Sequence, residues 1–349
     1  MTVFVCAGCG ASLTGALSQV ALPVHAHQQY GHELLPPLLE PGTYAVDPQP
    51  FGPPWLRWEE IGSEEAEARG VYAPVYSLSY GPSGAVAVAP GDIRGTVVIP
   101  ERCDGLCCGL DGRDGPNLAC ARCGRAVATL IDDCSYWQVV WLDPRAVRPL
   151  DAGAPAPRAL AWEELLKEQR ELPLVERIGA WNPVWVAAIG VALAHLLAVS
   201  NGTRVAVSTG PVADVFRSAL DALLPPGPPV KSLALAGPGL HGPAPDIALV
   251  PLHPRTGDMW SSGAGASVPL PADVWMYLAF NRNRRLHPAS GGLPHDVYRD
   301  DRPPPLPSIP FRPDRELFLD TLARLPEVRQ PWLRAIYDRV EDRRLVFPF

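Results

Sequence analysis

The sequence predicts an α+β fold with two parts, a β-rich domain over residues 1–150 and an α/β domain over residues 151–349 that ends in helices. In the first part, short β-prone runs alternate with proline- and glycine-containing breakers, which is typical of strands joined by turns. In the second part, continuous apolar runs lie between helical segments. This pattern indicates a short, mostly parallel sheet that is covered on both faces.

Several strands are expected in the first part. Turn-forming residues separate the early β-prone runs, so we expect a β-meander; the runs cover residues 43–46, 74–80, 85–89 and 95–99. The acidic segment 58–69 predicts one exposed helix, and segment 12–23 predicts a strand or a short helix. Two further strands are expected at 126–131 and 135–142.

A linker and a buried helix open the second part. Residues 151–158 alternate small residues with prolines, which bury little surface and resist helix formation. A charged amphipathic helix is expected at 162–172. Asn182 followed by Pro183 is a helix start signal, and the apolar helix that follows ends near residue 200. It is too short to span a bilayer comfortably, so we interpret it as a buried helix and expect no membrane association.

The rest of the second part alternates strands with helices. We expect strands at 204–208, 230–236 and 246–252 and helices at 211–224, 272–280, 314–325 and 331–344. Residues 281–310 predict a proline-rich extended segment. In the last helix, apolar residues follow the i, i+3, i+4, i+7 spacing that packs one face on a core: Leu333, Ile336, Tyr337 and Val340.

The amino-acid composition indicates a globular protein and argues against a nucleic-acid-binding one. The chain has 349 residues, and its apolar fraction of 47% supports a buried core. Its 42 prolines, 31 glycines and preference for arginine over lysine are typical of a GC-rich bacterial genome. The net charge of −7 argues against a nucleic-acid partner, which requires a basic surface. We interpret the one basic run, residues 281–285, as a solvated loop.

The N-terminal residues 1–6 lack the basic and apolar regions of a secretory signal, so a cytoplasmic protein is expected. Because that compartment is reducing, the cysteines are expected to bind metal and not to form disulfides. Two segments have the form C-x-x-C-G, namely C-A-G-C-G at residues 6–10 and C-A-R-C-G at residues 120–124. Such a turn directs two thiolates toward one point and supplies half of a tetrahedral zinc site.

Two pairings of these turns remain open. In the first, one zinc ion is bound by Cys6, Cys9, Cys120 and Cys123, and the similarity of the two turns favours it. In the second, Cys120 and Cys123 pair locally with Cys103 and either Cys107 or Cys108. Under the first pairing, four thiols remain, enough for a second site: Cys103, Cys107, Cys108 and Cys134. Cys134 and one member of the adjacent pair Cys107 and Cys108 would also suit buried packing without metal.

The two turns resemble those of zinc-ribbon proteins, and the resemblance covers only these short segments. It implies a structural metal and assigns no catalytic residue. Three histidines near the first turn, His25, His27 and His32, are a weaker metal candidate, because an extended segment places only the first two on one face. We interpret them as polar residues that face solvent or substrate.

The second part offers candidates at the carboxyl ends of its strands, where open α/β sheets bind ligands. The candidate catalytic residues are His241, His253, Arg255 and Asp258. Ser208, Thr209 and Gly210 precede a helix whose N-terminus favours an anion. None of the familiar nucleotide-binding or hydrolase motifs occurs. We therefore expect a zinc-stabilised protein that binds a protein or small-molecule ligand, with a small-molecule enzyme as the alternative.

Overall fold

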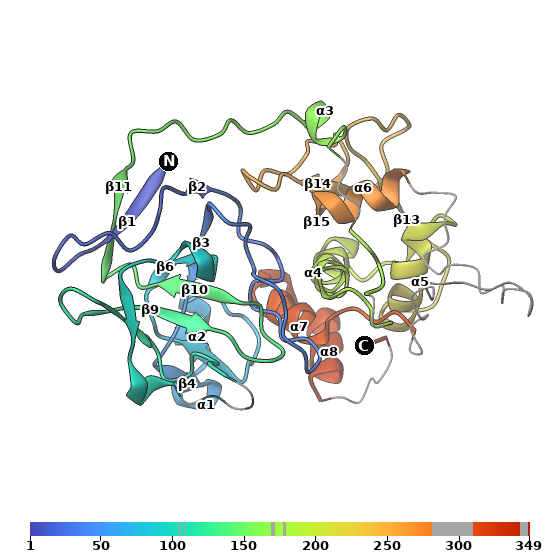
Figure 1. The fold of residues 1–349 in the computed structure, drawn as a ribbon. Coiled ribbons are helices and arrows are strands. Elements are labelled where there is room, and N and C mark those ends of the chain that lie inside the picture. Colours follow the sequence, from blue (N-terminus) through green and yellow to red (C-terminus); the bar gives the residue numbers. More distant parts are fainter. Residues whose placement is uncertain are drawn as a thin grey trace, which may run out of the picture. The chain divides into compact units, whose positions relative to one another are not determined.

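The computed structural model describes residues 1–103, 105, 107, 109–168, 172–176, 179–280, 310–342 and 348–349. Cys108, the basic run 281–285 and nearly all of the proline-rich segment 281–310 lie outside the described residues. The chain forms two compact units (Figure 1). The first unit contains Met1–Arg69, Pro74–Ala159 and Pro254–Gly257, and the second contains Gly70–Ala73, Leu160–His253 and Asp258–Phe349. The predicted division into domains of residues 1–150 and 151–349 stays a prediction.

A seven-stranded sheet forms the centre of the first unit, in the order β2-β3-β6-β10-β9-β8-β7. Its strands are β2 Ser18–Gln19, β3 Thr43–Pro50, β6 Ser83–Val88, β7 Thr96–Val98, β8 Leu118–Cys120, β9 Ala126–Ile131 and β10 Val139–Leu142. All neighbours are antiparallel except β2 and β3. The run from β7 to β10 is a meander in chain order, because each strand pairs with the next.

The meander expected before residue 100 is wrong. Strand β3 pairs directly with β6, and β7 lies at the far edge of the sheet. Between β3 and β6 the chain forms a separate pair of strands, β4 Trp55–Arg57 and β5 Ser77–Ser79. The single helix expected at 58–69 is two short helices, α1 Trp58–Ile61 and α2 Ser63–Ala68. Gly62 separates them with φ of 79°, which is outside the helical region.

The N-terminal strand joins the first unit through the end of its β-rich segment. Strand β1 (Thr2–Cys6) pairs antiparallel with β11 (Val147–Asp151), and Cys6 lies opposite Val147. One apolar core connects this pair with the large sheet, and it includes Phe4, Cys6, Leu13, Leu17, Tyr44, Val88, Leu118, Cys120, Val127, Val140 and Leu142. Two of the candidate ligands are therefore core residues.

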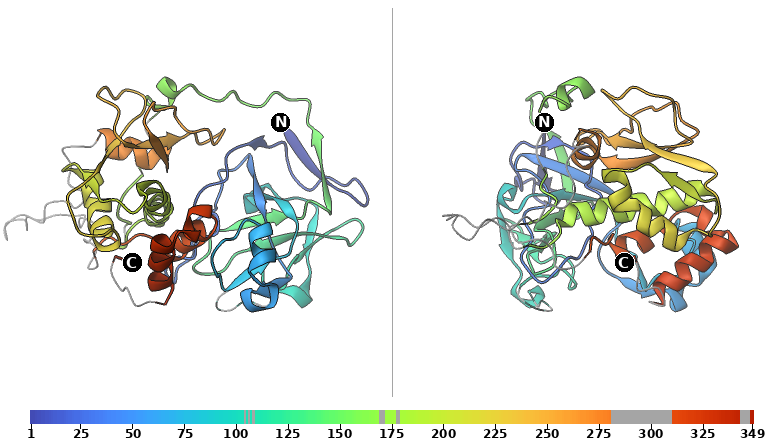
Figure 2. Two further views of the ribbon diagram at one scale, coloured as in Figure 1. Left: turned by 180° about the vertical axis from the view of Figure 1, so that it is seen from behind. Right: turned by 90° about the vertical axis from the view of Figure 1, so that its right-hand side faces the viewer.

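The second unit is α/β. Its four-stranded parallel sheet has the order β12 Val205–Val207, β13 Lys231–Leu235, β14 Ile247–Leu252 and β15 Ala266–Pro271. Its helices are α3 Trp162–Leu165, α4 Pro183–Ser200, α5 Pro211–Leu223, α6 Ala272–Phe280, α7 Arg315–Ala323 and α8 Pro331–Glu341. Figure 2 shows α7 and α8, in red, packed side by side. The predicted α+β class, with a short parallel sheet and C-terminal helices, is confirmed.

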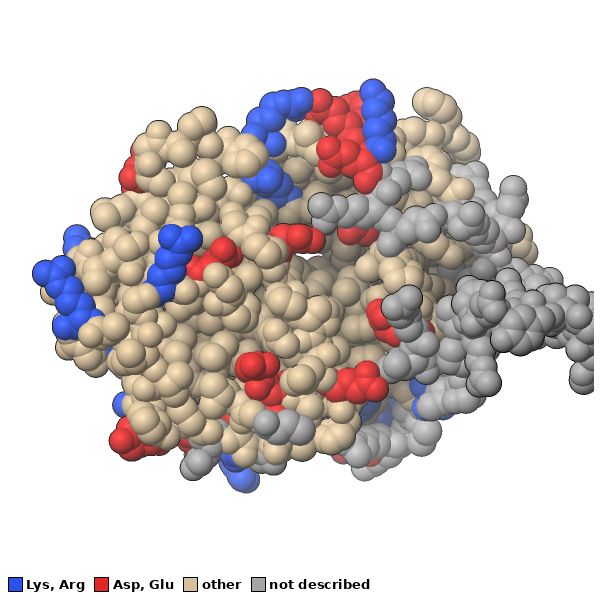
Figure 3. Space-filling model, viewed as in Figure 1, with Lys and Arg blue, Asp and Glu red and all other residues tan. Residues whose placement is uncertain are grey.

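Helix α4 is the buried centre of the second unit. The side chain of Asn182 accepts a hydrogen bond from the N–H of Val184 at 2.9 Å, as the start signal predicts. By length and composition the helix resembles a membrane span, but 78% of it is buried inside the protein. It packs against α7 and β15. On the face drawn in Figure 3, uncharged surface separates small groups of basic and acidic side chains.

Gly190 of α4 lies close against the residue that caps α7, and this contact provides a stability prediction. A Cβ atom at this position would lie 2.6 Å from the backbone oxygen of Asp314, which caps α7. We expect Gly190→Ala to lower the free energy of unfolding by about 1–3 kcal/mol, because a capped backbone cannot move aside. Urea denaturation measures the change. Gly242→Ala is the control, since no atom lies within 4 Å of its added carbon, and equal effects of the two substitutions would contradict the explanation.

Candidate metal centre

The first C-x-x-C-G turn follows β1 directly. The N–H of Cys6 donates to the carbonyl oxygen of Ala11 at 2.8 Å, and the N–H of Gly10 donates back to the carbonyl oxygen of Cys6 at 2.9 Å. Gly10 has φ of 73°, a left-handed conformation that glycine adopts without strain. The N–H of Ala7 donates to Ala146 at 2.9 Å and fastens the turn to the chain before β11. The cysteine side chains are thus held on a fixed backbone.

The second turn has the same geometry at the end of β8. The N–H of Cys120 donates to the carbonyl oxygen of Arg125 at 2.8 Å, and the N–H of Gly124 donates to Cys120 at 2.9 Å. Gly124 has φ of 74°. The N–H of Ala121 donates to Gly95 at 2.9 Å, the counterpart of the anchor in the first turn. Two segments more than a hundred residues apart therefore form matching halves of one site.

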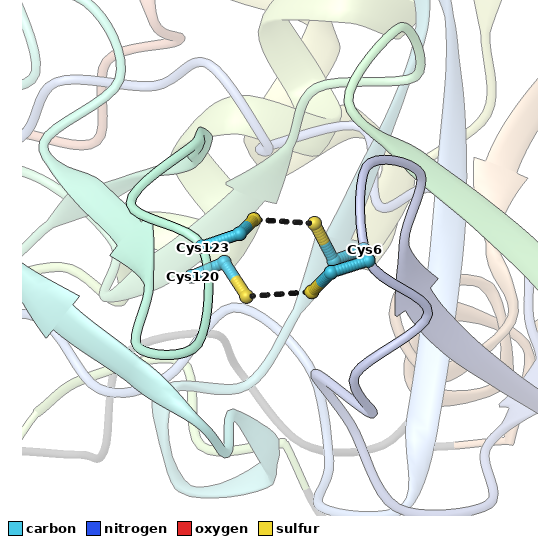
Figure 4. Close-up of side chains that lie close together, drawn as sticks. Cys6, Cys120 and Cys123 are labelled. Carbon is cyan, nitrogen blue, oxygen red and sulfur yellow. Dashed lines mark hydrogen bonds between the residues drawn. The ribbon is translucent and has the colours of Figure 1, made fainter.

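The two turns bring their sulfur atoms together (Figure 4). The Sγ atoms of Cys6 and Cys123 are 3.6 Å apart, as are those of Cys9 and Cys120. All four sulfurs lie within 4.8 Å of one another. A disulfide would require about 2.05 Å, so these are free thiols. Zinc–sulfur bonds of about 2.3 Å at tetrahedral angles separate neighbouring sulfurs by about 3.8 Å, which this cluster matches. The arrangement can hold a metal ion and is compatible with a zinc-ribbon-like site.

The surroundings of the thiols already favour one thiolate. Burial raises the pKa of Cys120, but hydrogen bonds from the backbone N–H groups of Arg122 and Cys123 and from the neighbouring thiols lower it to about 7. The N–H of Arg125 acts to lower the pKa of Cys123, but Cys6, Cys9 and burial together raise it to about 11. The hydrogen bonds within the cluster therefore favour ionisation of Cys120 over that of Cys123. A metal ion must displace the thiol protons when it binds, so its affinity rises with pH.

Accessibility differs across the site. Cys6 and Cys120 are fully buried, Cys9 is half-buried and Cys123 is exposed. The metal would lie at the boundary between core and solvent, where it can be loaded from one side and still be supported by the core. Arg122 covers part of that side, because its guanidinium donates to the carbonyl oxygen of Cys9 at 3.4 Å.

The other cysteines that the structure describes, Cys103, Cys107 and Cys134, do not join this cluster. The thiol of Cys103 donates to the carbonyl oxygen of Ile99 at 3.1 Å. Cys107 and Cys134 lie together with His32 in a second cluster of potential metal ligands. The structure therefore brings together the four residues of the first pairing, and it does not place Cys103 or Cys107 beside Cys120 and Cys123.

The three histidines after the first turn lie in different surroundings. The ring of His25 packs on Trp137 with centroids 4.4 Å apart, whereas Nε2 of His27 lies 2.8 Å from a carboxylate oxygen of Asp47. Of the three histidines, His32 alone belongs to a group of three or more potential metal ligands among the described residues. Sequence spacing did not indicate this, because its partner Cys134 is 102 residues away. No local motif links residues at that separation.

His25 predicts a dependence of stability on pH. Burial lowers its pKa from 6.5 to about 4, and its Nδ1 atom has no hydrogen-bond partner in the part of the chain that the structure describes. Between these values the unfolded chain binds more protons than the folded one, so stability falls as the pH drops from 6.5 to 4. The loss reaches about 3 kcal/mol at the low end. His25→Phe should flatten this part of the profile in urea denaturation, and identical slopes for both proteins would contradict the assignment.

Three of the four catalytic candidates lie in one short segment, where the N–H of His253 donates to the carbonyl oxygen of Asp258 at 2.9 Å. His253 is buried, with Nε2 2.9 Å from the carbonyl oxygen of Leu160 and its ring against the edge of Trp162. His241 and Asp258 are exposed. Arg255 belongs to the first unit, whereas the other three candidates belong to the second. Their grouping as an active site gains no support from this placement.

The predicted anion site before α5 stays a prediction. Ser208 and Thr209 are exposed, and Gly210 has φ of 120° where the helix begins. Asp214 places a carboxylate in the first turn of that helix, and this negative charge opposes a bound anion.

Comparisons of the chain with protein-family models, with curated proteins and with solved structures find no match. The functional argument therefore rests on the chain's own residues. Among the described residues, two groups of potential metal ligands stand out, the four-cysteine cluster and the cluster of His32, Cys107 and Cys134.

Proposed function

We propose that this is a cytoplasmic zinc protein in which Cys6, Cys9, Cys120 and Cys123 bind one structural Zn²⁺ ion. The observation that carries the proposal is the matched pair of turns, which presents four sulfurs at the spacing of a tetrahedral thiolate site. Four thiolates close the coordination sphere and leave no position for a substrate. The metal then supports folding and takes no part in catalysis.

The structural role follows from where the ligands lie. Cys6 ends β1 and Cys120 ends β8, so the metal would connect a strand outside the seven-stranded sheet with a strand inside it. Both residues belong to the apolar core of the first unit. A metal bound there stabilises contacts between segments that are far apart in the sequence, at the point where two short strands end.

The protein would act by binding a partner protein or a small ligand. The edge strand β7 supports a protein partner, because Val97 and Val98 are each about half-exposed there, at 51% and 50%. An edge strand with apolar side chains is a surface to which another chain can add a strand.

Metal analysis tests the zinc site directly. We expect Cys9→Ser and Cys123→Ser each to lose one equivalent of zinc relative to the native chain, measured by mass spectrometry of the purified protein under reducing conditions. Cys103→Ser is the matched control and should keep the native metal content, because its thiol binds a backbone carbonyl and not a metal. Native metal content in the Cys9 and Cys123 variants would contradict the proposal, and iron in place of zinc would contradict the choice of metal.

A further inference from the structure

A second group of potential metal ligands lies in the first unit, apart from the four-cysteine cluster. Sγ of Cys134 is 3.3 Å from Nδ1 of His32, and Sγ of Cys107 is 3.8 Å from Nε2 and 4.0 Å from Nδ1 of the same ring. The three ligand atoms all lie within 4.8 Å of one another. A tetrahedral zinc ion with ordinary bond lengths separates a sulfur from a nitrogen ligand by about 3.6 Å. The distances from Nδ1 to the two sulfurs lie on either side of that value.

Backbone hydrogen bonds hold His32 beside Cys134. The N–H of Ser135 donates to the carbonyl oxygen of Glu33 at 3.0 Å, and the N–H of Tyr30 donates to Ser135 at 2.9 Å. Ser135 has φ of 72°, a conformation that a residue with a side chain rarely adopts. Such a conformation persists where the surrounding structure requires it and is common at binding sites.

The segment that carries Cys107 is fastened to the same turn. Leu110 and Asp132 exchange backbone hydrogen bonds of 3.1 and 2.8 Å. A Cβ atom at Gly109 would lie 2.1 Å from the carbonyl oxygen of Asp132, so only glycine allows the two segments to approach this closely. Three segments distant in the sequence are thus brought together by backbone contacts next to the ligand atoms.

The charge near these ligands suits a cation. Asp133 is buried, with 1% of its surface exposed, and its carboxylate accepts a hydrogen bond from the N–H of Cys134 at 2.7 Å. A carboxylate beside the ligands lowers the energy of a bound cation and fixes the orientation of the ligating residue. Cys134 is buried, whereas His32 and Cys107 are exposed. One side of the cluster therefore faces solvent.

We propose that His32, Cys107 and Cys134 form a second zinc site and that water or another small ligand takes its fourth position, since no fourth protein ligand joins the three among the described residues. Two thiolates and one imidazole, with a fourth position left open, are a ligand set found in catalytic zinc sites, in contrast to the closed four-thiolate site. This inference goes beyond the structural zinc, because it gives the first unit a metal that an external ligand can reach.

Stoichiometry separates the two sites. The native chain should bind two equivalents of zinc, and Cys9→Ser and Cys134→Ser should each bind one. The double variant should bind none. His32→Ala and Cys107→Ser in the Cys9→Ser background should lose the remaining equivalent, whereas His27→Gln and Cys103→Ser in that background should keep it. One equivalent in the native chain, unchanged by Cys134→Ser, would overturn the second site and leave the structural zinc intact.

Cobalt tests the open position. The Cys9→Ser protein loaded with Co²⁺ should show visible bands of a tetrahedral site with mixed sulfur and nitrogen ligands, and added azide should shift them. The Cys134→Ser protein, which keeps only the four-thiolate site, should not respond to azide. Absence of a shift in the Cys9→Ser protein, or loss of its cobalt on Cys108→Ser, would overturn the open position, because either result means that the protein itself supplies a fourth ligand.

Discussion

Removal of zinc from the four-cysteine site is expected to lower the stability of the first unit, most of all at the two cysteine turns, and to leave the stability of the second unit unchanged. The binding free energy of a structural zinc contributes to folding and reaches about 10–16 kcal/mol in small zinc-binding peptides near pH 7. Even zinc at a thousand times its dissociation constant stabilises a folded state by about 4 kcal/mol. A loss of about 4 kcal/mol is already a large share of the free energy of unfolding of an ordinary domain.

The expected loss is concentrated in the first unit because its core contains the ligands. Cys6 and Cys120 are fully buried and belong to the apolar core of that unit. Without metal, the two turns that carry Cys6 and Cys120 lose the ion that would hold their sulfurs together at the edge of that core. The second unit has its own core around α4 and the parallel sheet, so we expect its folding not to depend on these sulfurs.

Hydrogen exchange resolves the effect by segment. After chelation, the amides of Gly10 and Gly124, which close the two turns, should lose protection, and those of β14 in the second unit should keep it. The experiment is best done with the Cys134→Ser protein, so that only the four-cysteine site is tested. The Cys9→Ser protein is the control and should not respond to the chelator at these turns. Equal loss of protection in both units would contradict a structural role confined to the first.

Local signals identified many elements but not how distant segments pair. Helices α5 and α6 and strand β9 lie within a residue of their expected bounds, because their apolar runs and the breaker residues beside them act locally. The pairing of β3 with β6 depends on where the intervening strand pair and helices pack, and no residue in either strand encodes that. The two matching cysteine turns were recognisable because each is a local motif.

Strand β15 and helix α3 show two other limits. Residues 266–271 contain Pro269 and Pro271, which argue against a strand, yet they form β15. This strand lies at the edge of its sheet. An edge strand tolerates proline because one of its sides makes no backbone hydrogen bonds. The helix expected at 162–172 is regular only over Trp162–Leu165, and residues 169–171 lie outside the described residues.

In the second unit, Trp275→Ala is expected to lower the free energy of unfolding by about 3–5 kcal/mol. The indole ring of Trp275 is fully buried, and its Nε1 donates to the carbonyl oxygen of Leu249 at 2.9 Å. That oxygen also accepts from the N–H of Ala236 at 3.0 Å, so it keeps a partner and the cost is mainly lost packing. Trp55→Ala is the control, because its side chain is 50% exposed and should cost far less. Comparable losses would contradict the packing argument.

A double-mutant cycle with Gly237 gives the sharpest test of this packing. A Cβ atom at Gly237 would lie 2.3 Å from Cζ2 and 2.7 Å from Cη2 of Trp275, so Gly237→Ala should cost about 1–3 kcal/mol in the native chain. Trp275→Phe removes the part of the indole that carries these atoms and leaves space for a methyl group. In that background Gly237→Ala should cost at least about 1 kcal/mol less, which is the non-additivity expected of residues in contact. Additive costs in urea denaturation would show that the glycine is required for another reason.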